Sequence, residues 1–127
     1  MNKFAKNVLI IEDHEVLGNT MKRVLKHFFS KEIVLSNFKN LVYEKTDFRN
    51  YDFLICNVNS KKDLKTLQLV NRIKQKYKHI KVLAITESPS KELERYTKNI
   101  GVDSLLSKPF SLDEILQPIK KGEKVAC

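Results

Sequence analysis

Short apolar runs alternate with helical periodicity along the whole chain, and this alternation restricts the possible folds more than any other feature. Each run is continuous in apolar residues instead of alternating with polar ones, which indicates a strand covered on both faces. After each run, apolar residues recur at intervals of three and four, as on the buried face of a helix. The five runs cover residues 7–11, 32–36, 51–57, 80–86 and 102–107.

Helix boundaries can be predicted from the same pattern. Ser90 is placed to cap a helix that Gly101 ends. Ser111 and Glu114 have the spacing of a capping box, in which each residue bonds the other's backbone N–H. The stretch at 38–48 is the weakest of the five. The helices are expected at about 15–29, 38–48, 63–77, 90–100 and 111–121.

Five β–α units with doubly covered strands predict an α/β fold with a five-stranded, doubly wound parallel sheet. Right-handed crossovers favour the flavodoxin-like strand order 2-1-3-4-5 at this size. The 127 residues suit one domain, which we expect over residues 1–121, with a short frayed tail at 122–127.

The composition bears on location. No apolar stretch is long enough to span a bilayer, and the first residues contain no apolar segment typical of a secretory signal. Cys56 and Cys127 are the only cysteines, and we interpret them as free thiols in a reducing compartment. We therefore expect a cytoplasmic protein with no membrane partner. The net charge of +9 favours anionic partners but says nothing about the fold.

Polar side chains stand where the predicted strands end. In a parallel sheet these ends meet at one edge, which is where such folds bind ligands. The edge thus receives two carboxylates, an amide, a hydroxyl and an ammonium group, with the amide at the centre of the predicted pocket. The residues are Glu12 and Asp13, Asn57, Thr86, and Lys108 followed by Pro109.

Over residues 6 to about 121 the chain resembles the receiver domain of two-component response regulators. The resemblance rests on the acidic pair Glu12–Asp13, on Thr86 and on the Lys108–Pro109 step. It implies a phosphoryl-accepting aspartate after the third strand and Mg²⁺ on the carboxylates. It also implies phosphoryl contacts from Thr86 and Lys108, and a cis Lys108–Pro109 bond. The implied role is signal transduction with a histidine kinase or another signalling protein as partner, not enzymatic activity.

The sequence departs from this family at the acceptor. The aspartate falls on Asn57, whose amide oxygen is a poor nucleophile and carries no charge to balance Mg²⁺. Asp52 stands at the other end of the strand and cannot replace it. The metal site keeps Glu12, Asp13, the Asn57 amide and the Asn59 backbone carbonyl. We therefore expect weak or absent Mg²⁺ binding, and Lys108 could pair with Asp13 instead.

Two further departures concern the switch. The loop at 58–63 lacks the proline and glycine usual in the family, and Leu105 occupies the position of the family's rotating aromatic residue. Two explanations stay open: a natural receiver that cannot be phosphorylated, or an ordinary response regulator with an Asp-to-Asn substitution at position 57. The first predicts a stand-alone interaction module that binds partners through its fourth helix, fifth strand and fifth helix.

Basic residues gather on one stripe of the predicted helix at 63–77. The functional interpretation is a docking face for an acidic protein or nucleic acid, and the alternative is a solvated helix face. Because no aromatic residue lies within the stripe, the sequence argues against a dedicated nucleic-acid-binding adaptor. His14, after the acidic pair, is expected at the rim of the pocket. The stripe consists of Lys61, Lys65, Arg72 and Lys76.

Overall fold

The computed structural model describes residues 4–37, 41–58 and 64–118. They form one five-stranded sheet in the order β2-β1-β3-β4-β5, with every neighbouring pair parallel, as predicted. The strands are β1 (Val8–Ile11), β2 (Ile33–Ser36), β3 (Phe53–Asn57), β4 (Lys81–Thr86) and β5 (Ser104–Ser107). Around them are α1 (Glu15–Leu25), the 3₁₀ turn η1 (Tyr43–Lys45), α2 (Leu64–Lys76), α3 (Lys91–Asn99) and a helical segment at 112–118.

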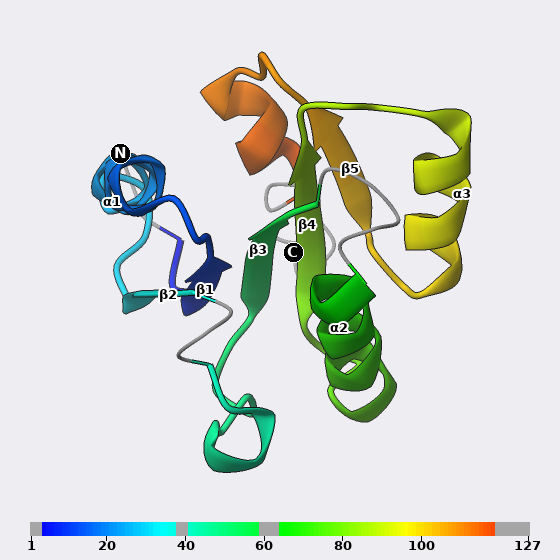
Figure 1. Cartoon of the computed structure of the whole chain (residues 1–127). Helices are drawn as coiled ribbons and strands as arrows, with labels where there is room; N and C mark the ends of the chain where they lie inside the picture. Colours follow the sequence, from blue (N-terminus) through cyan, green and yellow to red (C-terminus); the bar gives the residue numbers. More distant parts are fainter. Residues whose placement is uncertain (1–3, 38–40, 59–63, 119–127) are drawn as a thin grey trace.

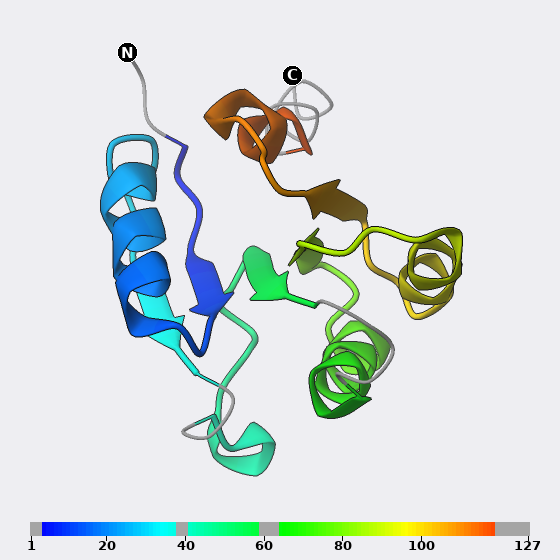
Figure 2. The same cartoon turned by 45° about the horizontal axis from the view of Figure 1, so that its top comes forward.

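The helices cover both faces of the sheet (Figures 1 and 2). Helix α1 and the segment at 112–118 lie on one face, and α2 and α3 lie on the other. Along β1, Val8 and Ile10 join the core under α1, whereas Leu9 and Ile11 join the core under α2 and α3. The central strands are continuously apolar, as predicted, because both of their faces are buried.

The predicted helix ends are confirmed where they can be seen. Ser90 Oγ accepts a hydrogen bond of 3.0 Å from Leu93 N at the start of α3. Gly101 follows α3 with φ +96°, a conformation that glycine adopts without steric cost. Ser111 and Glu114 form the capping box, with Ser111 N donating to Glu114 Oε1 (3.1 Å) and Glu114 N donating to Ser111 Oγ (3.2 Å).

The helix predicted at 38–48 is wrong for the part that the structure describes. Within 41–48 only Tyr43–Lys45 form a single 3₁₀ turn, and 38–40 lie outside the described residues. Asp47 offers one reason, because its carboxylate accepts hydrogen bonds from the backbone and guanidinium of Arg49. Phe48 supplies another: its buried ring packs against Tyr77 of the segment after α2, which fixes the turn in place.

A polar cluster joins three elements at the amino ends of β4 and β5. Asp103 Oδ2 accepts hydrogen bonds from Val82 N (2.8 Å) and from Lys74 Nζ (3.2 Å). Lys74 Nζ also donates to the Ile80 carbonyl at 2.8 Å. The Lys74 side chain is only 15% exposed, so water screens this pair less than it screens a surface pair. Asp103 thus anchors the end of α2 to the start of two strands.

We predict that Asp103→Ala lowers the free energy of unfolding by about 1–3 kcal/mol, because the Val82 N–H loses the Asp103 carboxylate and the Lys74 ammonium keeps only the Ile80 carbonyl of its two described acceptors. Glu44→Ala is the control, since its pair with Arg72 is exposed and should change stability by less than about 0.5 kcal/mol. Urea unfolding of both variants measures the difference. Equal losses would show that the Asp103 cluster does not anchor the sheet.

Candidate functional site

The polar residues predicted for the pocket do lie at the carboxyl edge of the sheet. Glu12 directly follows β1, Asn57 ends β3 and Thr86 ends β4. Lys108 follows β5, and its N–H donates to the Thr86 carbonyl at 2.9 Å. The strand register brings these residues together, because Ile11 pairs with Cys56 and neighbouring strands end at nearly the same level.

The central contact is a hydrogen bond between Asn57 and Glu12. Asn57 Nδ2 donates to Glu12 Oε1 at 3.1 Å, and the backbone N–H of His14 donates to Glu12 Oε2 at 3.1 Å. An ionised carboxylate can only accept, so the amide must turn its nitrogen toward Glu12. Both oxygens of the Glu12 carboxylate are therefore engaged by protein donors.

An aspartate at position 57 could not make this contact. Its carboxylate would stand at hydrogen-bond distance from that of Glu12, and two such charges repel unless a proton or cation lies between them. The Asn57 amide supplies a neutral donor at this point instead. Its other atom, Oδ1, is buried, and among the described residues no donor reaches it.

His14 has a structural role at the start of α1. Its ring atom Nδ1 accepts a hydrogen bond of 3.2 Å from Leu17 N, and the residue is exposed. The ring thus caps the helix, as serine or aspartate often does. The sequence predicted only that His14 lies at the pocket rim. It did not predict the cap, because histidine is not among the usual capping residues.

Lys108 forms an ion pair with Glu87, whereas the sequence suggested a pair with Asp13. Its Nζ lies 3.1 Å from Glu87 Oε1. The Lys108–Pro109 bond is cis, as the resemblance implied. Thr86 is fully buried, and its Oγ1 accepts a hydrogen bond of 3.1 Å from Ser88 N.

Cys56 and Asp52, at the two ends of the third strand, have structural roles. Burial raises the pKa of the Cys56 thiol to about 12, with a smaller contribution from the negative charge of Glu12, so the thiolate is strongly disfavoured at neutral pH. Asp52 lies at the opposite end of β3, where its Oδ2 accepts a hydrogen bond of 2.8 Å from Asn7 N. Asp52 therefore cannot replace an acceptor at position 57.

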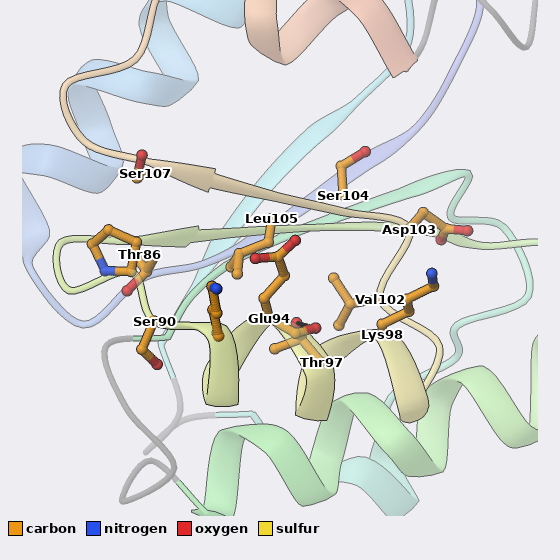
Figure 3. A pocket seen from close by; sticks show the side chains of 12 residues that line it. Thr86, Ser90, Glu94, Thr97, Lys98, Val102, Asp103, Ser104, Leu105 and Ser107 are labelled. Atoms are coloured by element: carbon orange, nitrogen blue, oxygen red, sulfur yellow. Dashed lines mark hydrogen bonds between the residues drawn. The ribbon is translucent and has the colours of Figure 1, made fainter.

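A groove between α3 and β5 was not predicted from the sequence. Its volume is about 720 Å³, and its wall includes Leu105, the position of the family's rotating aromatic residue. Figure 3 shows Glu94 rising from α3 toward Leu105, with Lys98 and Asp103 at one end of the groove. Only the terminal residues of β5, Ser104 and Ser107, are small, so the sequence carried little signal of a groove. Other lining residues are Thr86, Ser90, Thr97 and Ser107.

The basic stripe is only partly available for docking. Lys65, Arg72 and Lys76 are exposed on α2, while Lys61 and Asn59 lie outside the described residues. The Arg72 guanidinium stacks 3.8 Å from the centre of the Tyr43 ring, and its Nη2 lies 3.4 Å from Glu44 Oε1. Arg72 therefore also holds η1 against α2, and a docking role for the stripe stays a prediction.

The described part of the chain limits what the site could hold. Its helices include none long and apolar enough to cross a membrane. No group of three or more histidine, cysteine, aspartate or glutamate residues within it has the arrangement of a metal site. The fold and the site together define a doubly wound α/β domain with a receiver-type edge, whose central carboxylate is replaced by an amide.

The chain belongs to the response regulator receiver domain family, whose model matches residues 8–120. A curated relative, the transcriptional regulatory protein CrdR of Helicobacter pylori, is 27% identical over 117 residues, which are 91% of this chain and 54% of CrdR. The chain thus spans about half the length of that relative.

Two solved structures support the same assignment. The orphan response regulator HP1043 of H. pylori is 27% identical and has a TM-score of 0.69, with 94% of this chain and 98% of that chain covered. The second is an atypical orphan response regulator, described as having a phosphorylation-independent regulatory mechanism. It is 27% identical and has a TM-score of 0.73, with 91% of this chain and 92% of that chain covered. Both overlaps extend over nearly the whole chain.

We predict that Asn57→Asp makes stability depend on Mg²⁺. Without the metal, repulsion from Glu12 should lower the free energy of unfolding by about 1–3 kcal/mol, and Mg²⁺ should restore it by binding the new carboxylate. Asn50→Asp adds the same charge at an exposed position and should not respond. Thermal melts with and without Mg²⁺ test this. An equally large Mg²⁺ response in the wild type would contradict the role given to the amide.

We also predict that Cys56 resists alkylation in the folded protein. At pH 8 a thiol with a pKa of about 12 is almost entirely protonated, so iodoacetamide should react about a hundredfold or more slowly than with an ordinary thiol. Because the pKa is raised by burial, unfolding in urea should abolish the protection. Peptide mass spectrometry locates the label. Rapid labelling of Cys56 in native protein would show that the strand opens.

Proposed function

We propose that this receiver domain transmits signals through protein–protein contacts without being phosphorylated at position 57. The observation that carries the proposal is the Asn57–Glu12 hydrogen bond. It places a neutral hydrogen-bond donor, instead of a second carboxylate, beside Glu12, so the site needs no metal ion to offset repulsion between two carboxylates at this point. On this basis the domain is a binding module and not an enzyme, and it acts where its signalling partners are, in the cytoplasm.

The same contact argues for weak or absent Mg²⁺ binding. Glu12, Asp13 and the Asn57 amide oxygen are the described groups that would hold the ion, and its chemistry would be to neutralise phosphoryl oxygens. Glu12 already accepts one hydrogen bond on each oxygen, so a metal would share these oxygens with two protein donors. Asn57 contributes no charge, so a site with one carboxylate fewer should bind a divalent cation less tightly.

The face formed by α3, β5 and the segment at 112–118 is the favoured partner surface. It contains the groove of about 720 Å³, whose residues come from α3, β5 and the end of β4. Leu105 is half-buried against the core there, and it has no hydroxyl group that could signal a change at Thr86. The groove is formed in this conformation, which suits a partner that binds without a prior switch.

Similar proteins give this proposal a context. One structural neighbour is an atypical orphan regulator with a phosphorylation-independent mechanism. The curated relative is a transcriptional regulatory protein of about twice the matched length. We infer that the partner is a histidine kinase or an output protein of a signalling pathway. Direct nucleic-acid binding by α2 is disfavoured, because the Arg72 guanidinium is held by Tyr43 and Glu44.

The test is incubation with acetyl phosphate and Mg²⁺, followed by intact-mass measurement. We expect no gain of a phosphoryl group, about 80 Da, because the amide oxygen of Asn57 is too weak a nucleophile. Asn57→Asp is the matched variant that restores the chemistry to be tested. A phosphoryl adduct at position 57 of the wild type would contradict the proposal.

The Asn57→Asp variant also separates the two explanations of the asparagine. Full Mg²⁺-dependent phosphorylation of the variant would favour an ordinary response regulator carrying an Asp-to-Asn substitution. A variant that binds Mg²⁺ but stays unphosphorylated would favour a receiver whose loop and switch no longer support the reaction. Leu105 and the loop at 58–63 are the sequence features that favour the second result.

A further inference from the structure

A second groove lies between η1 and α2, apart from the proposed partner surface. Its volume is about 320 Å³, and it shares no described lining residue with the groove beside β5. Leu41, Val42 and Leu69 form its apolar part, and Val42 is 43% exposed. A partner that covered Val42 would remove apolar surface from water. The other lining residues are Tyr43, Glu44, Lys65, Gln68 and Arg72.

The wall of the groove that η1 forms is held in place from two sides. Thr46 Oγ1 donates to the Val42 carbonyl at 2.7 Å, and the Tyr43 ring packs against the buried ring of Phe48, with 5.5 Å between the ring centres. From the side of α2, the Arg72 guanidinium stacks on the Tyr43 ring. The groove is therefore formed before a partner arrives, which reduces the entropy that binding would cost.

The charge around this groove is mainly positive. Helix α2 contains four basic residues and no acidic residue. Two of the four, Lys65 and Arg72, line the groove and stand two helical turns apart, which is about 10 Å along the helix. Glu44 is the one carboxylate among the described lining residues, and it pairs with Arg72 at 3.4 Å. Both side chains of that pair are more than half exposed, so the pair is weak and another carboxylate could replace Glu44.

We propose that this groove binds an acidic segment of a protein partner, in which carboxylates flank apolar side chains. The apolar side chains cover Val42 and Leu69, and the carboxylates meet Lys65 and Arg72. Arginine suits this role, because its planar guanidinium can donate to both oxygens of one carboxylate. Nucleic acid fits less well, because bases stack on aromatic side chains and Arg72 already covers the Tyr43 ring.

A peptide titration followed by heteronuclear NMR tests the proposal. The probe is the capped peptide Gly-Glu-Leu-Leu-Glu-Gly, whose two glutamates stand about 10 Å apart in an extended chain. We expect it to shift the backbone amide signals of η1 and α2. The same peptide with glutamine in place of both glutamates should bind at least about fivefold more weakly, because it lacks the charges. Equal binding of the two peptides, no shifts, or shifts confined to α1 or β5 would overturn the proposal.

Two substitutions test the charges from the side of the protein. Lys65→Glu should raise the dissociation constant of the acidic peptide at least about fivefold, because it places a like charge in the groove. Glu44→Gln should lower the constant at least about twofold, because it removes the carboxylate that competes for Arg72. Lys26→Glu is the matched control. It makes the same charge change at the C-cap of α1, on the opposite face of the sheet, and should leave the constant unchanged at physiological salt (Figure 2).

The variants distinguish binding in the groove from a general attraction to a basic protein. Circular dichroism should show that all three are folded. Equal losses with Lys65→Glu and Lys26→Glu would assign the binding to net charge and overturn the proposal. Unchanged or weaker binding with Glu44→Gln would overturn it as well. A short oligothymidylate that shifted the same amides and bound more tightly than the peptide would assign the groove to nucleic acid instead.

This inference goes beyond the proposed function and does not rest on it. Lys65 and Glu44 lie outside the groove beside β5, so their substitution leaves that groove intact. Phosphorylation of the wild type by acetyl phosphate would contradict the proposed function and leave the peptide result unaffected. Failure of the peptide to bind would overturn this inference and leave the acetyl phosphate result unchanged.

Discussion

Burial of both faces of the parallel sheet is the constraint on which the rest of the structure depends. Because helices cover each face, the central strands have room only for apolar side chains. Polar chemistry is therefore confined to the edges, where strands end. The carboxyl edge collects Glu12, Asn57 and Thr86, while the opposite edge collects Asp52 and Asp103. The first group faces a pocket, and the second group ties the chain together.

The contact at position 57 changes what the carboxyl edge can do. In a receiver with an aspartate there, negative charge concentrates at this edge until a cation offsets it. Here the amide nitrogen of Asn57 satisfies Glu12 directly, and Lys108 pairs with Glu87. The edge keeps the residue types of its family, but Glu12 and Lys108 already have partners within the described structure. A receiver site can therefore keep most of its residue types and still lose its chemistry, just as one fold can carry different functions.

Most of the fold followed from periodicity, because the buried runs and helix caps are local signals. Ser90, Gly101 and the Ser111–Glu114 pair all have the predicted roles. The region at 41–48 could not be predicted, since Asp47 and Phe48 decide it through contacts that periodicity does not encode. At the site, the sequence predicted which polar residues stand at the ends of the strands. It could not predict the direction of their side chains, which decides whether Lys108 pairs with Glu87 and whether His14 caps a helix.

The amide bridge to Glu12 has an evolutionary consequence. Codons for asparagine and aspartate differ by one base, so the substitution at position 57 is easily reached and, in principle, easily reversed. With Asn57 donating to Glu12, however, no second carboxylate stands there for a cation to offset. If the domain signals without phosphorylation, as proposed, selection on the neighbouring phosphate-handling residues is relaxed, and changes such as leucine at position 105 carry no cost. Each such change makes the return to aspartate less useful, so an accessible mutation becomes a lasting one.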